Sequence, residues 1–189
     1  MDMPDEGSTG YWSGRRPVDE PAALHLRELG LFLSVHLGRA PGILWPENDH
    51  PALVEGPGEC DPELITDQLG LLTAGLGCLT GLSARTVAVD TVDTVDTVDT
   101  AGDEGDAAHA VRPGADTGDH LLVHQITGAA TWRLSRTRAA ADTEPGAPAS
   151  FACRLRPGEV LYVPAYWSRR AEFTAGVRYA VTRLRDPAL

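Results

Sequence analysis

The most informative segment of this chain reads LRPGEVLYVPAYWSR and covers residues 155–169. A turn signal at Pro157-Gly158 leads into a short apolar run that ends at Pro164. Apolar runs of this length, bounded by glycine and proline, are typical of buried β-strands. The segment therefore predicts strands joined by tight turns rather than a helix.

Similar β-rich runs lie on both sides of this segment. They are separated by turn signals at Thr127-Gly128, Glu144-Pro145-Gly146, Pro157-Gly158 and Ala175-Gly176. Many short strands at such spacing favour a sandwich or a barrel. The expected strands are 120–126, 131–135, 151–155, 159–163, 170–174 and 177–184.

Helical patterns come before these strands. The first predicted helix begins near Pro21, carries leucines at helical spacing and ends near Gly38. The second begins at Pro62, with Asp61 as its cap. Short extended pieces are expected between them, at 43–46 and 53–54. We therefore predict an α+β protein that is mainly β: a double-stranded β-helix (jelly-roll barrel) over about residues 84–185, with the two helices packed outside.

The length of 189 residues suits one domain. We expect residues 1–18 to be a disordered N-terminus and residues 19–189 to form the domain, interrupted by an acidic low-complexity insertion at 89–110. Val-Asp-Thr occurs four times in 89–100, a period that fits neither a strand nor a helix. The segment carries acidic residues and no lysine or arginine. We therefore expect it to be exposed and mobile rather than a calcium-binding loop. These acids are Asp90, Asp93, Asp96, Asp99, Asp103, Glu104 and Asp106.

Composition excludes several functions. The net charge of −11 disfavours nucleic acid as a partner. No apolar run is long enough to span a bilayer, and the polar N-terminus does not resemble a signal peptide. The cysteines Cys60, Cys78 and Cys153 are scattered and odd in number, which favours a reducing, cytoplasmic setting. All 16 basic residues are arginine, so any role of lysine would fall to arginine.

Two segments carry a family resemblance: DHLLVHQITGAATWRL at 119–134 and LRPGEVLYVPAYWSR at 155–169. Together with 176–184, they resemble the jumonji-C oxygenases and related bacterial cupin hydroxylases. The resemblance covers roughly the last 75 residues. It implies a barrel in which two histidines and one carboxylate hold Fe(II) beside 2-oxoglutarate.

The residues at the positions of that metal site do not match the family pattern. The expected His-x-Asp pair falls on Ala115 and Thr117, and the distal histidine falls on Arg169. The basic residue that anchors 2-oxoglutarate falls on Ala130. We therefore expect no metal and no cofactor in the barrel.

A shifted alignment would offer other donors. The fallback metal candidates are Asp116, Asp119, His120 and His124. Strand alternation places Leu121, Val123 and Gln125 on one face and the two histidines on the other. The resemblance puts the first set inside the barrel, which leaves the histidines outside, beneath the helices or in solvent. Outward histidines on one strand are more often not ligands than ligands.

The barrel interior would instead hold arginine. The resemblance places Arg169 at the iron position. Alternation groups Arg178, Ala180 and Thr182 on the face of the last strand that the resemblance turns inward. Two arginines near one cavity would bind a carboxylate or phosphate. The remaining ligand-binding candidates are Gln125, Trp132, Tyr162 and Tyr166. Two structural alternatives stay open: Arg169 and Arg170 pair with Glu159 or Glu172 at the rim, and the aromatic residues are plain core.

The leading functional hypothesis is a metal-independent jumonji-C-like cupin that binds a small molecule or peptide, with an anionic group favoured. The resemblance suggests a cofactor-free tailoring enzyme or an accessory protein of bacterial specialised metabolism. One alternative is an active Fe(II)/2-oxoglutarate-dependent hydroxylase with non-standard ligands. The other is a non-catalytic interaction protein whose acidic insertion meets a basic partner.

Overall fold

The computed structural model describes residues 20–50, 53, 62–90, 97–98, 118–136 and 150–188. The expected disordered segment at 1–18 lies outside these residues. The described elements are the helices α1 (Glu20–His36) and α2 (Pro62–Thr80) and the strands β1 (Gly42–Leu44), β2 (Ser83–Asp90), β3 (Thr97–Val98), β4 (His120–Thr127), β5 (Ala130–Arg136), β6 (Ser150–Leu155), β7 (Val160–Val163), β8 (Trp167–Phe173) and β9 (Arg178–Arg185).

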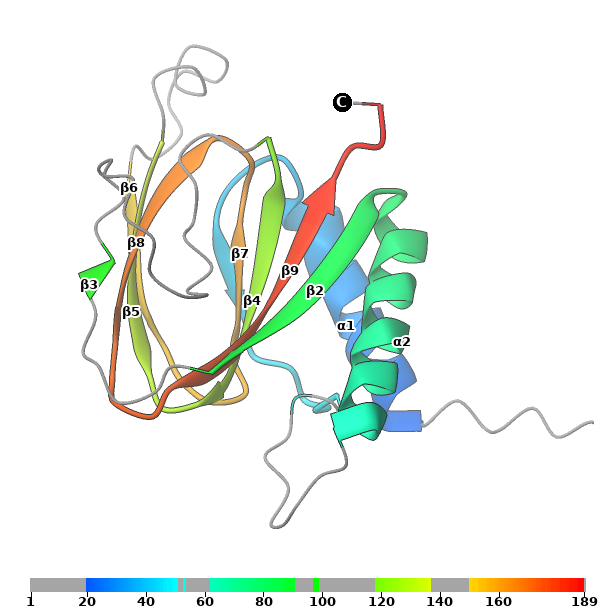
Figure 1. The fold of residues 1–189 in the computed structure, drawn as a ribbon. Helices are drawn as coiled ribbons and strands as arrows, with labels where there is room; N and C mark the ends of the chain where they lie inside the picture. The colour runs from blue at the N-terminus through cyan, green and yellow to red at the C-terminus, as the bar shows by residue number, and fades with distance from the viewer. Residues whose placement is uncertain are drawn as a thin grey trace, which may run out of the picture.

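The strands form two facing sheets (Figure 1). One sheet has the order β1-β7-β4-β9-β2 and the other has the order β3-β8-β5-β6. From β2 to β9, the chain crosses between the sheets so that β2 pairs with β9 and β3 pairs with β8, both antiparallel. This nested pairing defines the double-stranded β-helix, with β1 added at one edge. The predicted fold class, a mainly β jelly-roll barrel with N-terminal helices, is confirmed.

Two apolar cores follow from the alternation of side chains along the strands. Leu121 and Val123 of β4 point into the barrel, where they join Trp132, Leu161 and Val181. Between them, Leu122 points the other way and packs under the helices.

The helices cover the outer face of the five-stranded sheet (Figure 1). Leu29 and Leu33 of α1 and Leu72 and Leu76 of α2 lie one helical turn apart and pack on that sheet. Within the described part of the chain, no helix is long and apolar enough to cross a membrane.

The acidic repeat contributes to the barrel at two places. Its first two residues, Val89 and Asp90, end β2, and Thr97–Val98 form β3. In β3, Thr97 lies opposite Glu172 and Val98 lies opposite Ala171. The expectation that the whole 89–110 segment is an insertion without strand structure is therefore wrong for these residues. A ladder uses backbone groups, so a short strand does not need a two-residue period. The rest of the segment lies outside the described residues.

Candidate functional site

Arg169 is a cation inside the barrel. In β8, the alternating residues Trp167, Arg169 and Ala171 are all buried, and the first and last belong to the barrel core. The cross-strand neighbour of Arg169 is Leu134, also a core residue. Arg169 is 6% exposed, so the inward direction predicted for it is confirmed.

The two glutamates expected as rim partners are engaged elsewhere. Glu159 accepts hydrogen bonds from the Trp45 indole at 2.7 Å and from the Arg156 backbone N–H at 2.8 Å. Glu172 lies 3.9 Å from Arg133 on the surface. Among the described residues, Arg169 has no ion-pair partner, and its buried Nε has no hydrogen-bond partner.

Burial is the main influence on the charge of Arg169. The pKa of the guanidinium is lowered to about 10, mainly by burial and secondly by the nearby Arg183, while Asp119 acts in the opposite direction. The group therefore stays charged at neutral pH. Arg183 lies on β9 opposite Leu121, which faces the barrel, so it stands on the inner side of the same rim. Arg85 on β2 is the other cross-strand neighbour of Arg183 and is exposed.

The expected facing of β9 is wrong. Tyr179 and Val181 lie in the barrel core, so Arg178, Ala180 and Thr182 face the other way. The error is one residue of register, which exchanges the two faces of a strand. A register irregularity between Gln125 and Thr127 on the neighbouring strand accompanies it. Arg183, which the sequence reasoning missed, is the arginine of β9 that faces the barrel, near the opposite end of the strand from Arg178.

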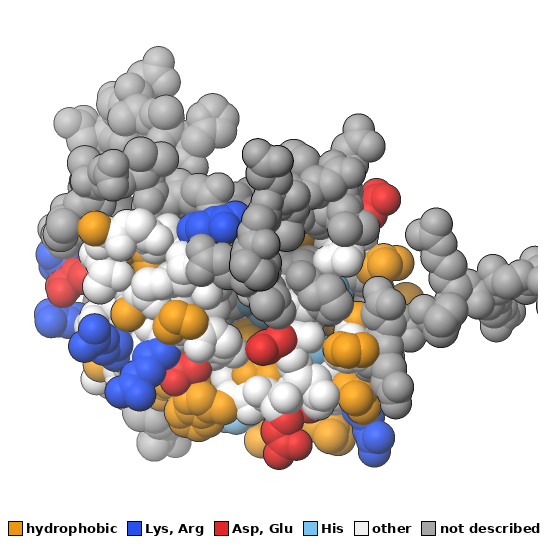
Figure 2. Space-filling view, turned by 90° about the horizontal axis from the view of Figure 1, so that it is seen from below, with side chains coloured by type: hydrophobic (Ala, Val, Ile, Leu, Met, Phe, Trp, Pro, Cys, Tyr) orange, Lys and Arg blue, Asp and Glu red, His pale blue; other side chains and the backbone are white. Residues whose placement is uncertain are grey.

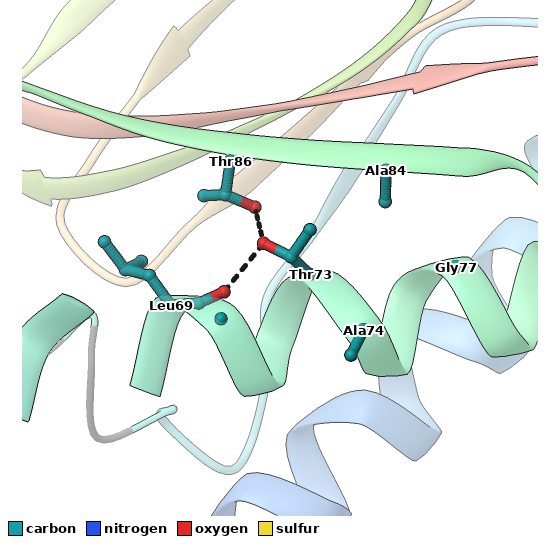
Figure 3. Close-up of a pocket in the computed structure, with 7 residues that line it drawn as sticks. Leu69, Thr73, Ala74, Gly77, Ala84 and Thr86 are labelled. Atoms are coloured by element: carbon teal, nitrogen blue, oxygen red, sulfur yellow. Dashed lines mark hydrogen bonds between the residues drawn. The ribbon is translucent and has the colours of Figure 1, made fainter. Parts of the chain in front are cut away.

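Thr182 belongs instead to a chain of hydroxyls beneath α2. Its Oγ1 lies 2.9 Å from Thr86 Oγ1, which accepts a hydrogen bond of 2.6 Å from Thr73. Figure 3 shows the link from Thr73 to Thr86, beside a groove of about 650 Å³. The groove is lined by Leu69, Gly70, Thr73, Ala74, Gly77, Ala84 and Thr86. Sequence reasoning did not identify it, because small residues on a helix give no distinctive pattern.

The remaining candidates are spread over the molecule. Trp132 is barrel core, as the structural alternative proposed, and Gln125 is buried and donates to the Thr127 carbonyl at 2.7 Å. Tyr162 packs under the helices rather than inside the barrel, so its candidacy as an interior ligand residue was wrong. Tyr166 is 46% exposed and adopts a φ of 62° near Gly118.

Tyr162 anchors α1 to the sheet through its hydroxyl. It accepts a hydrogen bond of 2.8 Å from the Gly38 backbone N–H, just beyond the helix end. It donates one of 2.8 Å to Nδ1 of His120, which also accepts from the Ala165 N–H at 3.1 Å. Burial raises the pKa of Tyr162, so the phenol keeps its proton. His120 is thus occupied as a hydrogen-bond acceptor.

The structure does not bring the other fallback metal candidates together at one site either. Asp119 is 3% exposed and its carboxylate accepts from Arg185 Nε at 2.7 Å. His124 lies under α1, which is one of the two outward placements left open by the sequence. Asp116 lies outside the described residues, as do Ala115 and Thr117. In the described part of the chain, no three His, Cys, Asp or Glu side chains are arranged to hold a metal as they stand. With Ala130 in the core and Arg169 at the distal position, the described residues do not fit an iron and 2-oxoglutarate site in the barrel.

Comparisons with known proteins add likenesses of fold. No family model and no curated protein sequence matches the chain. Iron-bound HEPD of Streptomyces albus with 2-hydroxyethylphosphonate is 15% identical over 56% of this chain and 19% of its own, with a TM-score of 0.36. RmlC of Streptococcus suis with dTDP-D-xylose is 6% identical over 55% and 44%, with a TM-score of 0.37. Procruciferin, an 11S globulin of Brassica napus, is 13% identical over 34% and 15%, with a TM-score of 0.27. The chain spans less than half the length of each, and the jelly-roll assignment rests on its own strand order.

Proposed function

We propose that this protein is a metal-independent, jumonji-C-like cupin that binds a small anionic molecule, or the acidic group of a peptide, at the barrel rim around Arg169. One observation carries the proposal. Arg169 is buried among apolar barrel residues and has no ion-pair partner among the described residues. The protein would act either as a binding protein or as a cofactor-free tailoring enzyme.

A buried unpaired guanidinium is unfavourable unless something compensates its charge. Removing an ion from water costs several kcal/mol, and folded proteins offset this with a counterion or hydrogen bonds. Asp119 is the nearest carboxylate that influences Arg169, and it is already bonded to Arg185. A bound carboxylate or phosphate would satisfy Arg169 in the fork geometry that guanidinium favours.

Neighbouring arginines add positive charge around Arg169. Arg183 is close enough to lower the pKa of Arg169, and Arg85 lies beside Arg183 on the next strand. Two such groups at one rim attract an anion and repel a cation. An iron ion is disfavoured at the same place, because the positive charge of Arg169 stands where the resemblance expects a histidine ligand.

The test is the binding of simple anions to the purified chain. Inorganic phosphate and 2-oxoglutarate would be titrated by calorimetry into wild type, Arg169→Met, Arg183→Met and a surface control, Arg133→Met. We expect at least one anion to bind wild type and the control equally, with affinity at least tenfold lower in both rim variants. Binding should persist in EDTA.

Two results would overturn the proposal. One is the absence of binding by either anion, together with no anion-dependent rise in melting temperature. The other is binding that the two rim substitutions leave unchanged, which would place the anion elsewhere. Oxygen-dependent release of succinate from 2-oxoglutarate would instead establish the hydroxylase alternative.

A further inference from the structure

Three histidines meet in the interior between α1 and the sheet, away from the Arg169 site. They are His25 on α1, His50 in the segment that follows β1, and His124 on β4. Their exposed fractions are 2%, 1% and 2%. The ring of His25 is centred 5.8 Å from that of His50 and 5.9 Å from that of His124. We call these residues the histidine cluster.

Each residue is directed there by its element. His25 precedes Leu29 and Leu33 by one and two helical turns, so it shares their sheet-facing side. His124 shares the helix-facing side of β4 with Leu122, and its cross-strand neighbour on β9 is the small Ala180. Figure 2 shows only small areas of histidine on the face that it views.

The cluster contains more nitrogen atoms than hydrogen-bond partners. His25 Nδ1 lies 2.7 Å from the Asn48 carbonyl, so this nitrogen carries the proton and Nε2 keeps a free lone pair. Nε2 of His25 and both nitrogens of His124 are buried without a hydrogen-bond partner. Buried unsatisfied polar atoms are rare in proteins, and several around one point call for an occupant.

The space between the rings limits what that occupant can be. A cavity of about 10 Å³ lies among the three histidines, and Asp49, Glu159 and Gln125 also line it. This is room for one water molecule or one ion. Glu28 and Asp49 place negative charge near His25, which favours a cation.

From this geometry we infer that His25, His50 and His124 bind one divalent transition-metal ion, with Zn²⁺ the preferred species. The His25 arrangement matches metal-bound imidazoles, whose second nitrogen commonly donates to a backbone carbonyl. Three neutral imidazoles are a standard ligand set for zinc, and Asp49, which also lines the cavity, offers a carboxylate oxygen for a fourth position.

The three histidine side chains must move closer together to bind the ion. As they stand, no three described donors are arranged to hold a metal. Two imidazoles bound tetrahedrally to one zinc ion at about 2.1 Å have ring centres about 5 Å apart. The observed 5.8 and 5.9 Å are less than 1 Å from that spacing. Rotation about the soft χ2 torsion of histidine turns a nitrogen inward without moving the backbone. The ion would then tie α1 and the following loop to β4.

The experiment uses the full chain, stripped with chelator and titrated with Co²⁺ and Zn²⁺. We expect one equivalent of Co²⁺ with visible ligand-field bands, competed off by Zn²⁺, and a melting temperature that Zn²⁺ raises by several degrees. His50→Gln and His124→Gln should each weaken binding by more than about a hundredfold, because even the loss of a supporting residue costs 10–100-fold. His36→Gln on α1 is the matched control and should bind as wild type does.

Three outcomes would overturn the inference. They are less than about half an equivalent of Co²⁺ bound by folded wild type, binding unchanged in both cluster variants, and binding lost equally in the His36 control. If the glutamine variants fail to fold, X-ray absorption at the zinc edge of Zn²⁺-loaded wild type decides the case, because it counts imidazole ligands. Two or three imidazoles support the inference, and none would overturn it.

Discussion

Replacing Arg169 with methionine should stabilise the ligand-free protein. Burial holds the pKa of this guanidinium at about 10, below its ordinary value. At about 1.4 kcal/mol per pKa unit, that lowering corresponds to ~3 kcal/mol of disfavour for the charged form in the folded state. Methionine fills a similar volume and needs no counterion, as in other replacements of buried charges by apolar residues.

We expect the unfolding free energy of Arg169→Met to exceed that of wild type by about 1–3 kcal/mol. For a chain of this size, about 1 kcal/mol moves the melting temperature by roughly 2–4 °C. Arg169 is protonated in both the folded and the unfolded state below its folded pKa of about 10. The difference should therefore be constant from about pH 6 to 9 and shrink only at higher pH.

The assay is urea denaturation of both proteins with and without the anion found by calorimetry. Anion at about 100 times the wild-type dissociation constant should raise wild-type stability by ~2.7 kcal/mol, and that of Arg169→Met by at most ~1.4 kcal/mol if its affinity is tenfold or more lower. The control Arg133→Met removes an exposed contact with Glu172 and should change stability by less than about 1 kcal/mol. A loss of more than about 1 kcal/mol in Arg169→Met, with an intact anion response, would refute the reasoning and make Arg169 a structural residue.

Three further expectations concern other parts of the fold. Tyr162→Phe should lose about 1–3 kcal/mol in urea denaturation, because it removes two part-buried hydrogen bonds of the hydroxyl, from the Gly38 N–H and to His120 Nδ1. Burial raises the pKa of Cys153 to about 11. At pH 8, iodoacetamide should therefore label exposed Cys78 much faster, and labelling of Cys153 should rise only as pH approaches 11, by peptide mass mapping. Tyr166→Gly should raise the melting temperature, since glycine relieves a φ of 62° that costs tyrosine about 1 kcal/mol or more; an unchanged or lower value would contradict this.

The strand pattern was predictable because it depends on local chemistry. The turns at Gly128, Gly158 and Gly176 adopt positive φ, where glycine is favoured, and the apolar runs between them became strands within one to three residues of the expected bounds. On β4, alternation gave the correct facing because the resemblance supplied its register. On β9 the same reasoning gave the wrong face, since an error of one residue exchanges the two faces of a strand, and Arg183 rather than Arg178 faces the barrel.

The histidine cluster could not be assembled from the sequence, because its members come from segments far apart in the chain. Each left a partial signal. His25 interrupts the leucine side of a helix, and alternation together with the resemblance placed His124 on the outer face of its strand, beneath the helices or in solvent. Nothing in the sequence brings His50 to the same point, since that depends on the path between β1 and α2.

The two proposed sites make opposite demands, and this allows them to be separated. The barrel rim presents fixed positive charge from Arg169 and Arg183, so it should take an anion and be insensitive to chelators. The histidine cluster presents lone pairs with carboxylates nearby, so it should take a cation and be indifferent to Arg169→Met. Iron found in purified protein would therefore not by itself support a hydroxylase. If His124→Gln removes that iron and Arg169→Met does not, the metal lies outside the barrel and the anion site stands.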